Sequence, residues 1–179
     1  SELKSIIEYE RKQVEDRQEL LEKFSEKLAQ HESKTNYPVP EVRFIEESKL
    51  EEFLYNRTSV WIESVAQYDE TWWGFQDYIF VEKFSEWLKW TWTIFPAEQQ
   101  AKLLSDESAS EKGRLLSEKN KRRFIKSIPV LTDFMSTIWV NGDYVVFVYC
   151  RETPMHAVEI HSSLLARDLR TIFKKMWEE

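Results

Sequence analysis

Apolar side chains in residues 1–32 recur at alternating spacings of four and three residues, the heptad pattern of a coiled-coil helix. The segment contains no glycine or proline and is densely charged, and its apolar stripe is narrow. We therefore predict a coiled-coil dimerisation helix over residues 1–32. Its expected homodimer seam consists of Leu3, Ile7, Val14, Leu21, Phe24 and Leu28.

Two charged residues, Glu10 and Arg17, interrupt this seam at equivalent positions seven residues apart. They can fix the register or favour antiparallel pairing, or they can extend their long side chains out of a loosely packed seam. The helix as a whole has a rival interpretation, in which it packs back onto its own domain.

Residues 33–40, SKTNYPVP, mark a boundary, because two prolines and several polar turn formers end the helix. We assign this segment to a linker and residues 41–179 to one globular domain. The chain begins with Ser1 rather than methionine and is already inside a helical pattern. We therefore expect a fragment of a longer protein from which an N-terminal part has been removed.

After the linker the pattern changes to short apolar runs separated by polar residues. The run VRFI at 42–45 predicts a strand, and Ser48 with Glu51 forms a capping box for a helix over 48–56. The β-branched residues of 59–67 favour a second strand. A helical period then begins at Phe80, and its apolar face consists of Phe80, Val81, Phe84, Trp87, Leu88 and Thr91.

The second half of the domain is richer in strand patterns. We expect a strand near 101–104, a helix over 108–119 and a strand over 122–129. The run STIWVNGDYVVFVYC at 136–150 predicts a hairpin with Asn141-Gly142 as its turn, and MHAVEIH adds a third antiparallel strand. A final helix follows a serine cap, with an apolar side of Leu165, Leu169, Ile172, Phe173 and Trp177. The predicted class is α/β with a mixed sheet.

Three stretches carry a resemblance to a known family: PVPEVRFIEESKLEEFL, STIWVNGDYVVFVYC and HAVEIHSSLLARDLRTIFKKMWEE. With the heptad helix ahead of them, they span nearly the whole chain and resemble TrmB-like archaeal and bacterial transcriptional regulators, in the part after their DNA-binding head. The resemblance implies a coiled-coil helix followed by a phospholipase D-like α/β domain with helices on its faces. It also implies a homodimer, DNA binding through a winged helix that is absent here, and a possible small-molecule effector. The chain has no room for the further sugar-binding domain of some members.

Charge and composition fit this interpretation. A formal net charge of −7 argues against a generic nucleic-acid surface, but it does not oppose a DNA-binding parent whose DNA-binding part is missing. No apolar run is long enough to span a membrane. One cysteine excludes an internal disulfide, and a cytoplasmic location is the simplest expectation. Three scattered histidines and one cysteine do not form a zinc site, and we expect no metal or cofactor.

The sequence also argues against catalysis. Phospholipase D chemistry requires a nucleophilic histidine with a lysine two residues later, whereas Val158 follows His156 and Ser163 follows His161 at that spacing. We expect no enzymatic activity. Cys150 lies in an apolar strand, where an inert buried thiol is expected. The basic run KNKRRFIK at 119–126 can bind phosphate or nucleic acid, or it can be a solvated helix end followed by the exposed face of a strand.

The stretch TWWGFQDYIFVEKFSEWLKWTW at 71–92 holds five of the eight tryptophans. Adjacent tryptophans do not both follow one core direction, and Gly74 allows unusual backbone geometry or a close approach. Alternatively, Asp77 caps the following helix and Gln76 ties down the loop. Polar groups between bulky rings are typical of ligand pockets, so we predict a ligand-binding site at Trp72, Trp73, Phe75, Gln76 and Asp77.

Three functions are compatible with these patterns. The first is a non-catalytic dimerisation and effector-sensing region of a transcription regulator. The second is a protein-interaction or scaffold domain that uses the aromatic surface around residues 71–92. The third is a divergent phosphodiesterase, which the missing His-Lys pairs disfavour.

Overall fold

The computed structural model describes residues 39–105, 121–128 and 135–179. The chain divides into two compact units, Ser1–Val39 and Pro40–Glu179, and the second contains every element described below. The predicted dimerisation helix over residues 1–32, most of the linker and the predicted helix over 108–119 lie outside the described residues.

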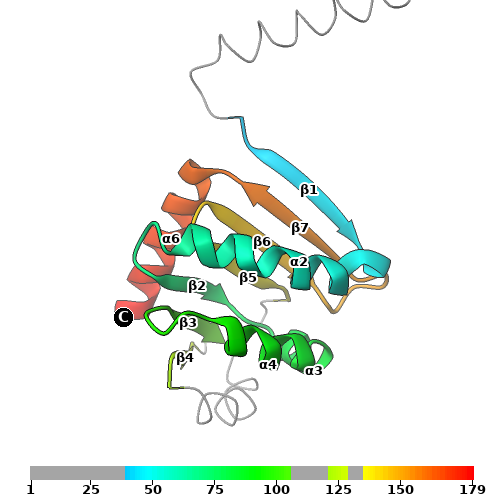
Figure 1. Cartoon of the computed structure of the whole chain (residues 1–179), viewed down its shortest axis with the longest axis horizontal. Coiled ribbons are helices and arrows are strands. Elements are labelled where there is room, and N and C mark those ends of the chain that lie inside the picture. The colour runs from blue at the N-terminus through cyan, green and yellow to red at the C-terminus, as the bar shows by residue number, and fades with distance from the viewer. Residues whose placement is uncertain (1–38, 106–120, 129–134) are drawn as a thin grey trace, which may run out of the picture. The chain divides into compact units, whose positions relative to one another are not determined.

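The second unit is built on a mixed seven-stranded sheet with the order β1-β7-β6-β5-β2-β3-β4 (Figure 1). Strands β2, β3 and β4 run parallel, while β5, β6, β7 and β1 pair antiparallel, beginning with β5 against β2. The strands are β1 (Glu41–Glu46), β2 (Thr71–Phe75), β3 (Gln100–Ser105), β4 (Arg123–Ser127), β5 (Thr137–Asn141), β6 (Tyr144–Tyr149) and β7 (His156–His161).

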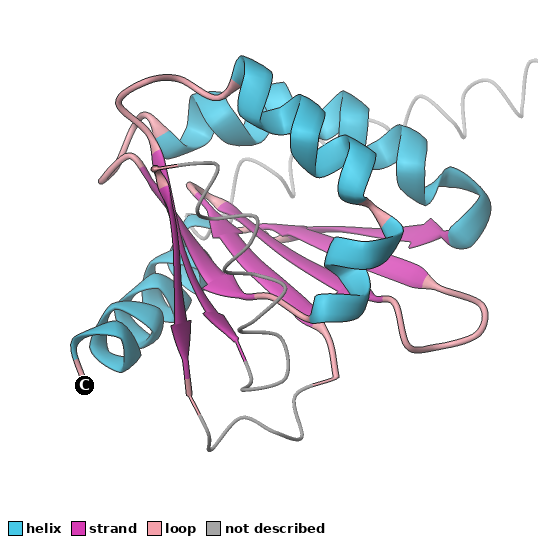
Figure 2. Ribbon diagram, turned by 90° about the horizontal axis from the view of Figure 1, so that it is seen from below, coloured by secondary structure: helices cyan, strands magenta, loops and turns pink. Residues whose placement is uncertain are grey.

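Helices cover both faces of the sheet (Figure 2). The helices are α2 (Glu47–Val65), α3 (Tyr78–Lys83), α4 (Ser85–Ile94) and α6 (Ser163–Glu178). The first three lie on one face and α6 lies on the other, where it contacts β2, β5 and β6. The predicted α/β class with a mixed sheet is therefore confirmed.

The predicted strand over 59–67 is wrong, because α2 continues to Val65. Its buried residues include Leu54, Thr58, Trp61 and Val65, which are spaced four, three and four residues apart on one helical face. The β-branched residues suggested a strand, but tertiary packing overrides that weak preference. The Ser48 capping box is also wrong, since the helix begins one residue earlier without a side-chain cap.

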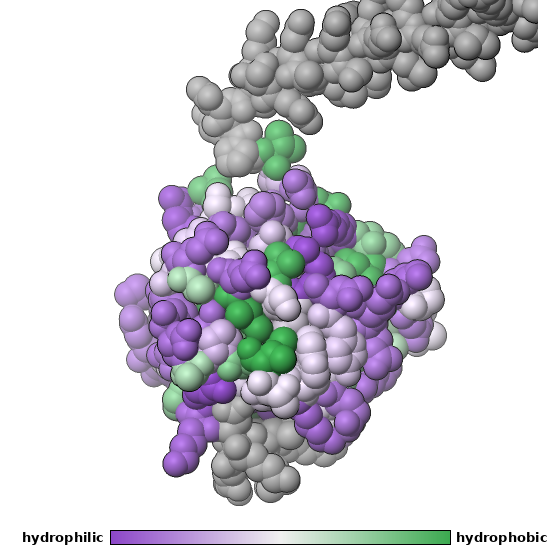
Figure 3. Space-filling model, in the orientation of Figure 1, coloured by the Kyte–Doolittle hydropathy of each residue, from purple (hydrophilic) through white to green (hydrophobic). Residues whose placement is uncertain are grey.

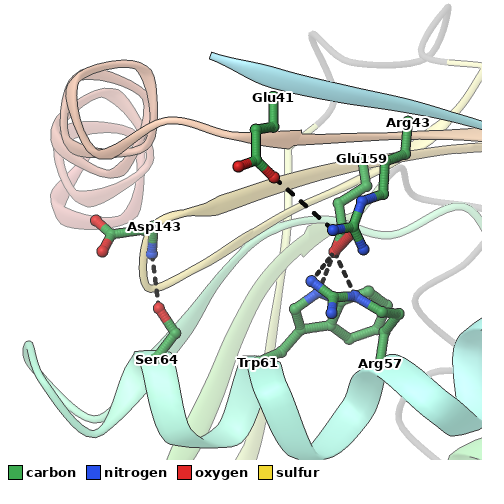
Figure 4. Close-up of polar contacts among 7 residues, drawn as sticks. All are labelled: Glu41, Arg43, Arg57, Trp61, Ser64, Asp143 and Glu159. Atoms are coloured by element: carbon green, nitrogen blue, oxygen red, sulfur yellow. Dashed lines mark hydrogen bonds and ion pairs between the residues drawn. The ribbon is translucent and has the colours of Figure 1, made fainter. Parts of the chain in front are cut away.

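The predicted hairpin is confirmed, but its turn lies one residue further along. Asn141 pairs with Tyr144, so Gly142 and Asp143 form the turn, and Gly142 has a φ of 63°. The Asp143 amide donates a hydrogen bond of 2.9 Å to the Ser64 hydroxyl, which fixes the turn against the end of α2 (Figure 4). A side chain at Gly142 would collide with Ser64 as well as strain the backbone.

The last helix begins as predicted after a serine, because the Ser162 hydroxyl accepts a hydrogen bond from the Leu165 amide. Phe173 is buried in the core beneath α6, with Leu165, Leu169 and Trp177 partly buried beside it. The expectation that Ile172 joins this apolar side is wrong, since it is 53% exposed.

Each face of the sheet has its own apolar core. On the side of α2 and α4, the rings of Trp61, Trp72, Trp87 and Trp139 pack against one another, with centroids 5.5–6.4 Å apart. Outside this core, that side of the molecule is largely hydrophilic, with an apolar area near its centre (Figure 3). Within the described ranges, no helix combines the length and apolar character that a membrane crossing requires.

Candidate functional site

The central strand β2 separates the residues of the predicted ligand site. Trp72 belongs to the core on the side of α2 and α4, whereas Trp73 and Phe75 belong to the core beneath α6. Successive side chains of a strand point to opposite faces, and both faces of β2 are covered, so adjacent tryptophans are both buried. Gly74 provides the predicted close approach, because a Cβ atom there would lie 2.0 Å from the Ile138 carbonyl oxygen.

Asp77 follows β2 and is bound by arginine rather than by the next helix. It occupies the residue before α3, but its carboxylate accepts nothing from the first amides of that helix, so the predicted capping role is wrong. Instead, Arg151 donates to both carboxylate oxygens at 2.7 and 3.1 Å. A bidentate pair with a guanidinium is stronger than a hydrogen bond from a neutral backbone amide. The Asp77 carboxylate therefore binds Arg151 and not the first amides of α3. The Asp77 amide donates to the Thr137 hydroxyl.

Gln76 points into the core on the side of α4. Its side-chain oxygen accepts a hydrogen bond of 3.0 Å from Nη2 of Arg123, the first residue of β4. Both side chains are at least 95% buried. This contact orients the Gln76 amide, because its oxygen must face the guanidinium and its nitrogen must then face away.

A small cavity lies beside this pair, between α4 and the strands β2, β3 and β4. Its volume is about 30 Å³. Apolar walls come from α4, β3 and β5 and include Trp87, Leu88, Leu103 and Trp139. The polar residues that line it are Trp72, Gln76, Thr91 and Arg123.

Each of these four polar residues has one buried atom without a hydrogen-bond partner. The atoms are Nε1 of Trp72, Nε2 of Gln76, Oγ1 of Thr91 and Nε of Arg123. Unpaired buried polar atoms are uncommon in folded proteins and each costs about 1–3 kcal/mol. All four atoms belong to residues that line the cavity, but the atoms themselves are covered by their neighbours, and the wall that the cavity exposes is almost entirely apolar.

Arg123 is unusual in its electrostatics. Its guanidinium forms no ion pair with a carboxylate in the described part of the chain. Burial away from water lowers its pKa from the usual 12.5 to about 10, which still leaves it charged at neutral pH. Among the described residues, no carboxylate therefore compensates this cation, which lies beside the cavity.

A second buried charge has ion-pair partners and connects β7 to α2, although one of its two oxygens makes no hydrogen bond (Figure 4). The Glu159 carboxylate is 2% exposed and accepts hydrogen bonds from Arg57 at 2.9 Å and from the Trp61 indole at 3.0 Å. Arg43 of β1 lies 3.7 Å from its other oxygen. Because two arginines and an indole surround this carboxylate, it functions as a structural connection between β1, β7 and α2.

The nearby surface between β1 and α2 holds an open groove of about 440 Å³, lined by Phe44, Lys49, Glu52 and Arg57 among others. Acidic and basic side chains alternate along it, so it has no preference for one sign of charge. Among the described residues, no group of three potential metal ligands comes together.

The described part of the basic run 119–126 is not one solvated face. Arg123 is buried, Arg122 donates to the carbonyl oxygens of Phe95 and Pro96, and Lys126 donates to the Trp177 carbonyl oxygen at 2.9 Å. The expectation of an exposed strand face is therefore wrong for these three cations.

The comparisons with known proteins give a likeness of fold. No family model matches the chain, and no curated protein matches it. The structure of NucT from Helicobacter pylori matches with a TM-score of 0.52 and 7% identity, over 78% of this chain and 97% of that chain. The structure of TrmBL2, an archaeal chromatin protein that shows a novel mode of DNA binding, matches with a TM-score of 0.48 and 14% identity. That match covers 98% of this chain and 68% of the TrmBL2 chain.

Sequence reasoning found two of the four polar residues at the cavity as site residues, Trp72 and Gln76. It placed Thr91 on an apolar helix face and Arg123 in a solvated run. The alternation of side chains in β4 could have indicated that Arg123 is buried, because Arg123 and Ile125 lie on one side of the strand and Phe124 lies on the other.

Proposed function

We propose that this chain is a non-catalytic dimerisation and effector-sensing region of a transcription regulator. The observation that supports it best is the small, largely apolar cavity beside the buried Gln76–Arg123 pair in the domain core, because a ligand that binds the folded domain stabilises it. The cavity joins β2, α4 and β4, so an occupant would hold three elements together. In this proposal, residues 1–32 dimerise and a winged-helix head, outside these 179 residues, contacts DNA.

The sheet architecture and the quoted motifs support a phospholipase D-like class for residues 41–179. The surroundings of the described histidines support a non-catalytic role. The ring of His156 stacks on Tyr149 and that of His161 on Tyr144, with centroids 4.6 and 4.5 Å apart. Neither histidine has the lysine two residues later that the nucleophilic chemistry requires.

A protein-interaction domain remains the second candidate, but the aromatic stretch gives it little exposed surface. Most of its rings are buried, and Tyr78, Trp90 and Trp92 are half-buried. The exposed apolar side chains that favour this candidate lie elsewhere, on the edge strand β1, where Val42 and Phe44 are 63% and 66% exposed.

Light scattering on the 179-residue chain and on residues 33–179 tests the dimerisation part of the proposal. We expect a dimer for the whole chain and a monomer for the shortened one, because the heptad seam lies in the removed segment. A matched control is the whole chain with Leu21→Glu, which places a charge in the seam and should give a monomer without shortening the protein.

Two other outcomes would count against the regulator. If both chains are monomers, the first helix does not dimerise and the argument for a two-headed protein fails. If both are dimers, the globular unit supplies the interface, and the exposed strand β1 becomes the first surface to mutate.

A further inference from the structure

Strand β1 lies at an edge of the sheet and is paired on one side. Its one partner among the described strands is β7, so the backbone N–H and C=O groups on its outer side have no strand of that part of the chain to bind (Figure 1). An open groove of about 440 Å³ between β1 and α2 leaves the α2 side of this edge clear. An exposed edge of this kind is a template for pairing with another strand.

The two faces of β1 differ in character. Arg43 and Ile45 face α2, where Arg43 lies 3.7 Å from the Glu159 carboxylate and Ile45 is buried in the core. Val42 and Phe44 alternate with these residues and point to the opposite face. Both are more than half exposed, so α6 does not cover them. The edge therefore combines an unpaired backbone with an uncovered apolar row, a combination typical of interaction surfaces.

The charges of β1 complement those of a second copy in one register. A strand that pairs antiparallel with its own copy around a twofold axis has one residue opposite itself. With Val42 at that position, Glu41 lies opposite the partner's Arg43, and Arg43 lies opposite the partner's Glu41. Centring on Arg43 would place two arginines opposite each other, and centring on Phe44 would place Arg43 opposite Ile45. Of these three registers, the first joins opposite charges and places Val42 against Val42.

The side chains that would form these ion pairs are placed to reach a partner. The Arg43 guanidinium lies 3.7 Å from the Glu159 carboxylate and 3.8 Å from that of Glu41, and both distances exceed that of a hydrogen bond. The side chains of Arg43 and Glu41 are 53% and 65% exposed. Each can therefore contact a neighbouring strand from its present position.

We propose that β1 pairs antiparallel with β1 of a second copy of this chain, with Val42 on the twofold axis, so that the two seven-stranded sheets become continuous. A contact along one strand edge is small, so two separate domains would associate weakly through it. Two copies already held together by residues 1–32 would pair at a high effective concentration. The strength of the contact in the whole chain therefore rests on the dimerisation proposed above.

Cross-linking of the 179-residue chain tests this contact. Val42→Cys places a thiol opposite its own copy, where two Cβ atoms of a cross-strand pair are close enough for a disulfide. The native thiol of Cys150 is 3% exposed and does not compete. With oxidised glutathione as the oxidant, we expect a cross-linked dimer on a non-reducing gel, formed at least ten times faster than in an exposed control variant.

Two other cysteine variants serve as controls. Phe44→Cys tests the register, because the two Phe44 positions would be four residues out of line, about 13 Å apart along the strands, which is too far for a disulfide. Leu164→Cys tests exposure alone, since Leu164 is 55% exposed at the start of α6. Both should cross-link slowly. Circular dichroism checks that each variant is folded.

Charge variants test the ion pairs. Glu41→Arg, added to Val42→Cys, places arginine opposite the partner's Arg43 and should slow cross-linking about tenfold, because two attractive pairs become repulsive. Glu46→Arg makes the same change of charge on the same strand, but Glu46 lies beyond the residues that pair in this register. It should leave the rate of cross-linking unchanged.

Three results would overturn the proposal. These are a Val42→Cys rate equal to that of Leu164→Cys at both micromolar and millimolar protein concentration, equal rates for Val42→Cys and Phe44→Cys, or equal effects of Glu41→Arg and Glu46→Arg. The proposed dimerisation by residues 1–32 can fail separately. A chain that is dimeric by light scattering but does not cross-link at Val42 lacks the β1 contact. A chain that is monomeric at micromolar concentration but cross-links at millimolar concentration has the β1 contact without the dimerisation helix.

Discussion

At the scale of single residues, buried groups in this domain have different protonation behaviour according to their neighbours. Cys150 ends the hairpin, where burial is the main cause that raises its thiol pKa to about 12, and the nearby Asp77 carboxylate adds to the effect. Lys83 acts in the opposite direction, and its ammonium donates to the Cys150 carbonyl oxygen. The thiol is therefore protonated at neutral pH.

We predict that Cys150 resists alkylation in the folded protein. At pH 8 the rate with iodoacetamide should be at least a hundredfold below that of a free thiol, because the thiolate is the reactive species. Mass spectrometry over time measures this rate, and unfolding in guanidinium should restore rapid labelling. Labelling at the same rate before and after unfolding would show that the thiol is accessible and ionises normally.

Much of the candidate site could not be predicted at this scale because burial depends on neighbours far along the chain. Gln76 and Arg123 are 47 residues apart, and Asp77 and Arg151 are 74 apart. The sequence identified Gln76 and Asp77 as unusual, but it contained no local signal for their partners. Asp77 was expected to cap a helix, which is a local interaction, whereas the observed partner, Arg151, lies in the segment that follows β6.

At the scale of elements, polar contacts join helices to specific strands. Glu159 connects β7 to α2 through Arg57 and Trp61, and to β1 through Arg43. Strand periodicity predicted β7 correctly, but it could not distinguish a solvated Glu159 from a buried one. The wrong strand prediction for 59–67 has the same cause, because local sequence does not show contacts with distant residues. This segment includes Trp61, whose indole binds the buried Glu159 carboxylate.

Glu159→Gln should destabilise the domain by about 2–3 kcal/mol. The substitution keeps the shape but removes the charge that compensates the arginines, and breaking a buried pair on one side is costly. Chemical denaturation followed by circular dichroism measures the change. The control is Glu86→Gln, whose carboxylate pairs with Lys89 on the exposed surface and should change stability by less than about 0.5 kcal/mol.

If the two substitutions have equal effects, the Glu159 network does not hold β7 against α2.

At the scale of the whole molecule, the sequence predicted the α/β class and six of the seven strands, counting from β1 to β7. The strand it missed is β2, the centre of the sheet, where residues alternate between two apolar cores. Such a strand lacks the polar and apolar alternation of a half-exposed strand. The aromatic residues of β2 were therefore interpreted as the wall of a ligand pocket, although they belong to the two cores.

Acid stability should depend on the contact between α6 and the start of β2. Burial alone would raise the Asp69 pKa, but hydrogen bonds from Lys174 at 2.7 Å and from Trp73 at 2.9 Å hold that pKa below its usual 3.8. A lowered pKa in the folded state stabilises the protein above about pH 4, and this contribution is lost as the pH falls through the folded-state pKa.

Asp69→Asn should therefore lower stability at pH 7 by about 1 kcal/mol, a modest value because the side chain is partly exposed to solvent. Denaturation curves at pH 7 and pH 3 measure the difference between the variant and the unaltered protein. The difference should shrink toward pH 3, and a difference independent of pH would mean that the lost contribution is not electrostatic.

The position of β1 has a consequence for how the protein is made. Among the described strands, β1 has one pairing partner, β7, and Glu41 pairs with His161 across 120 residues of sequence. Strand β1 is therefore synthesised before the other described strands but finds its partner only when β7, the last of them, has been made. Until then its apolar residues can pair with other chains, so the yield of native protein should depend on chaperones that protect β1 during synthesis.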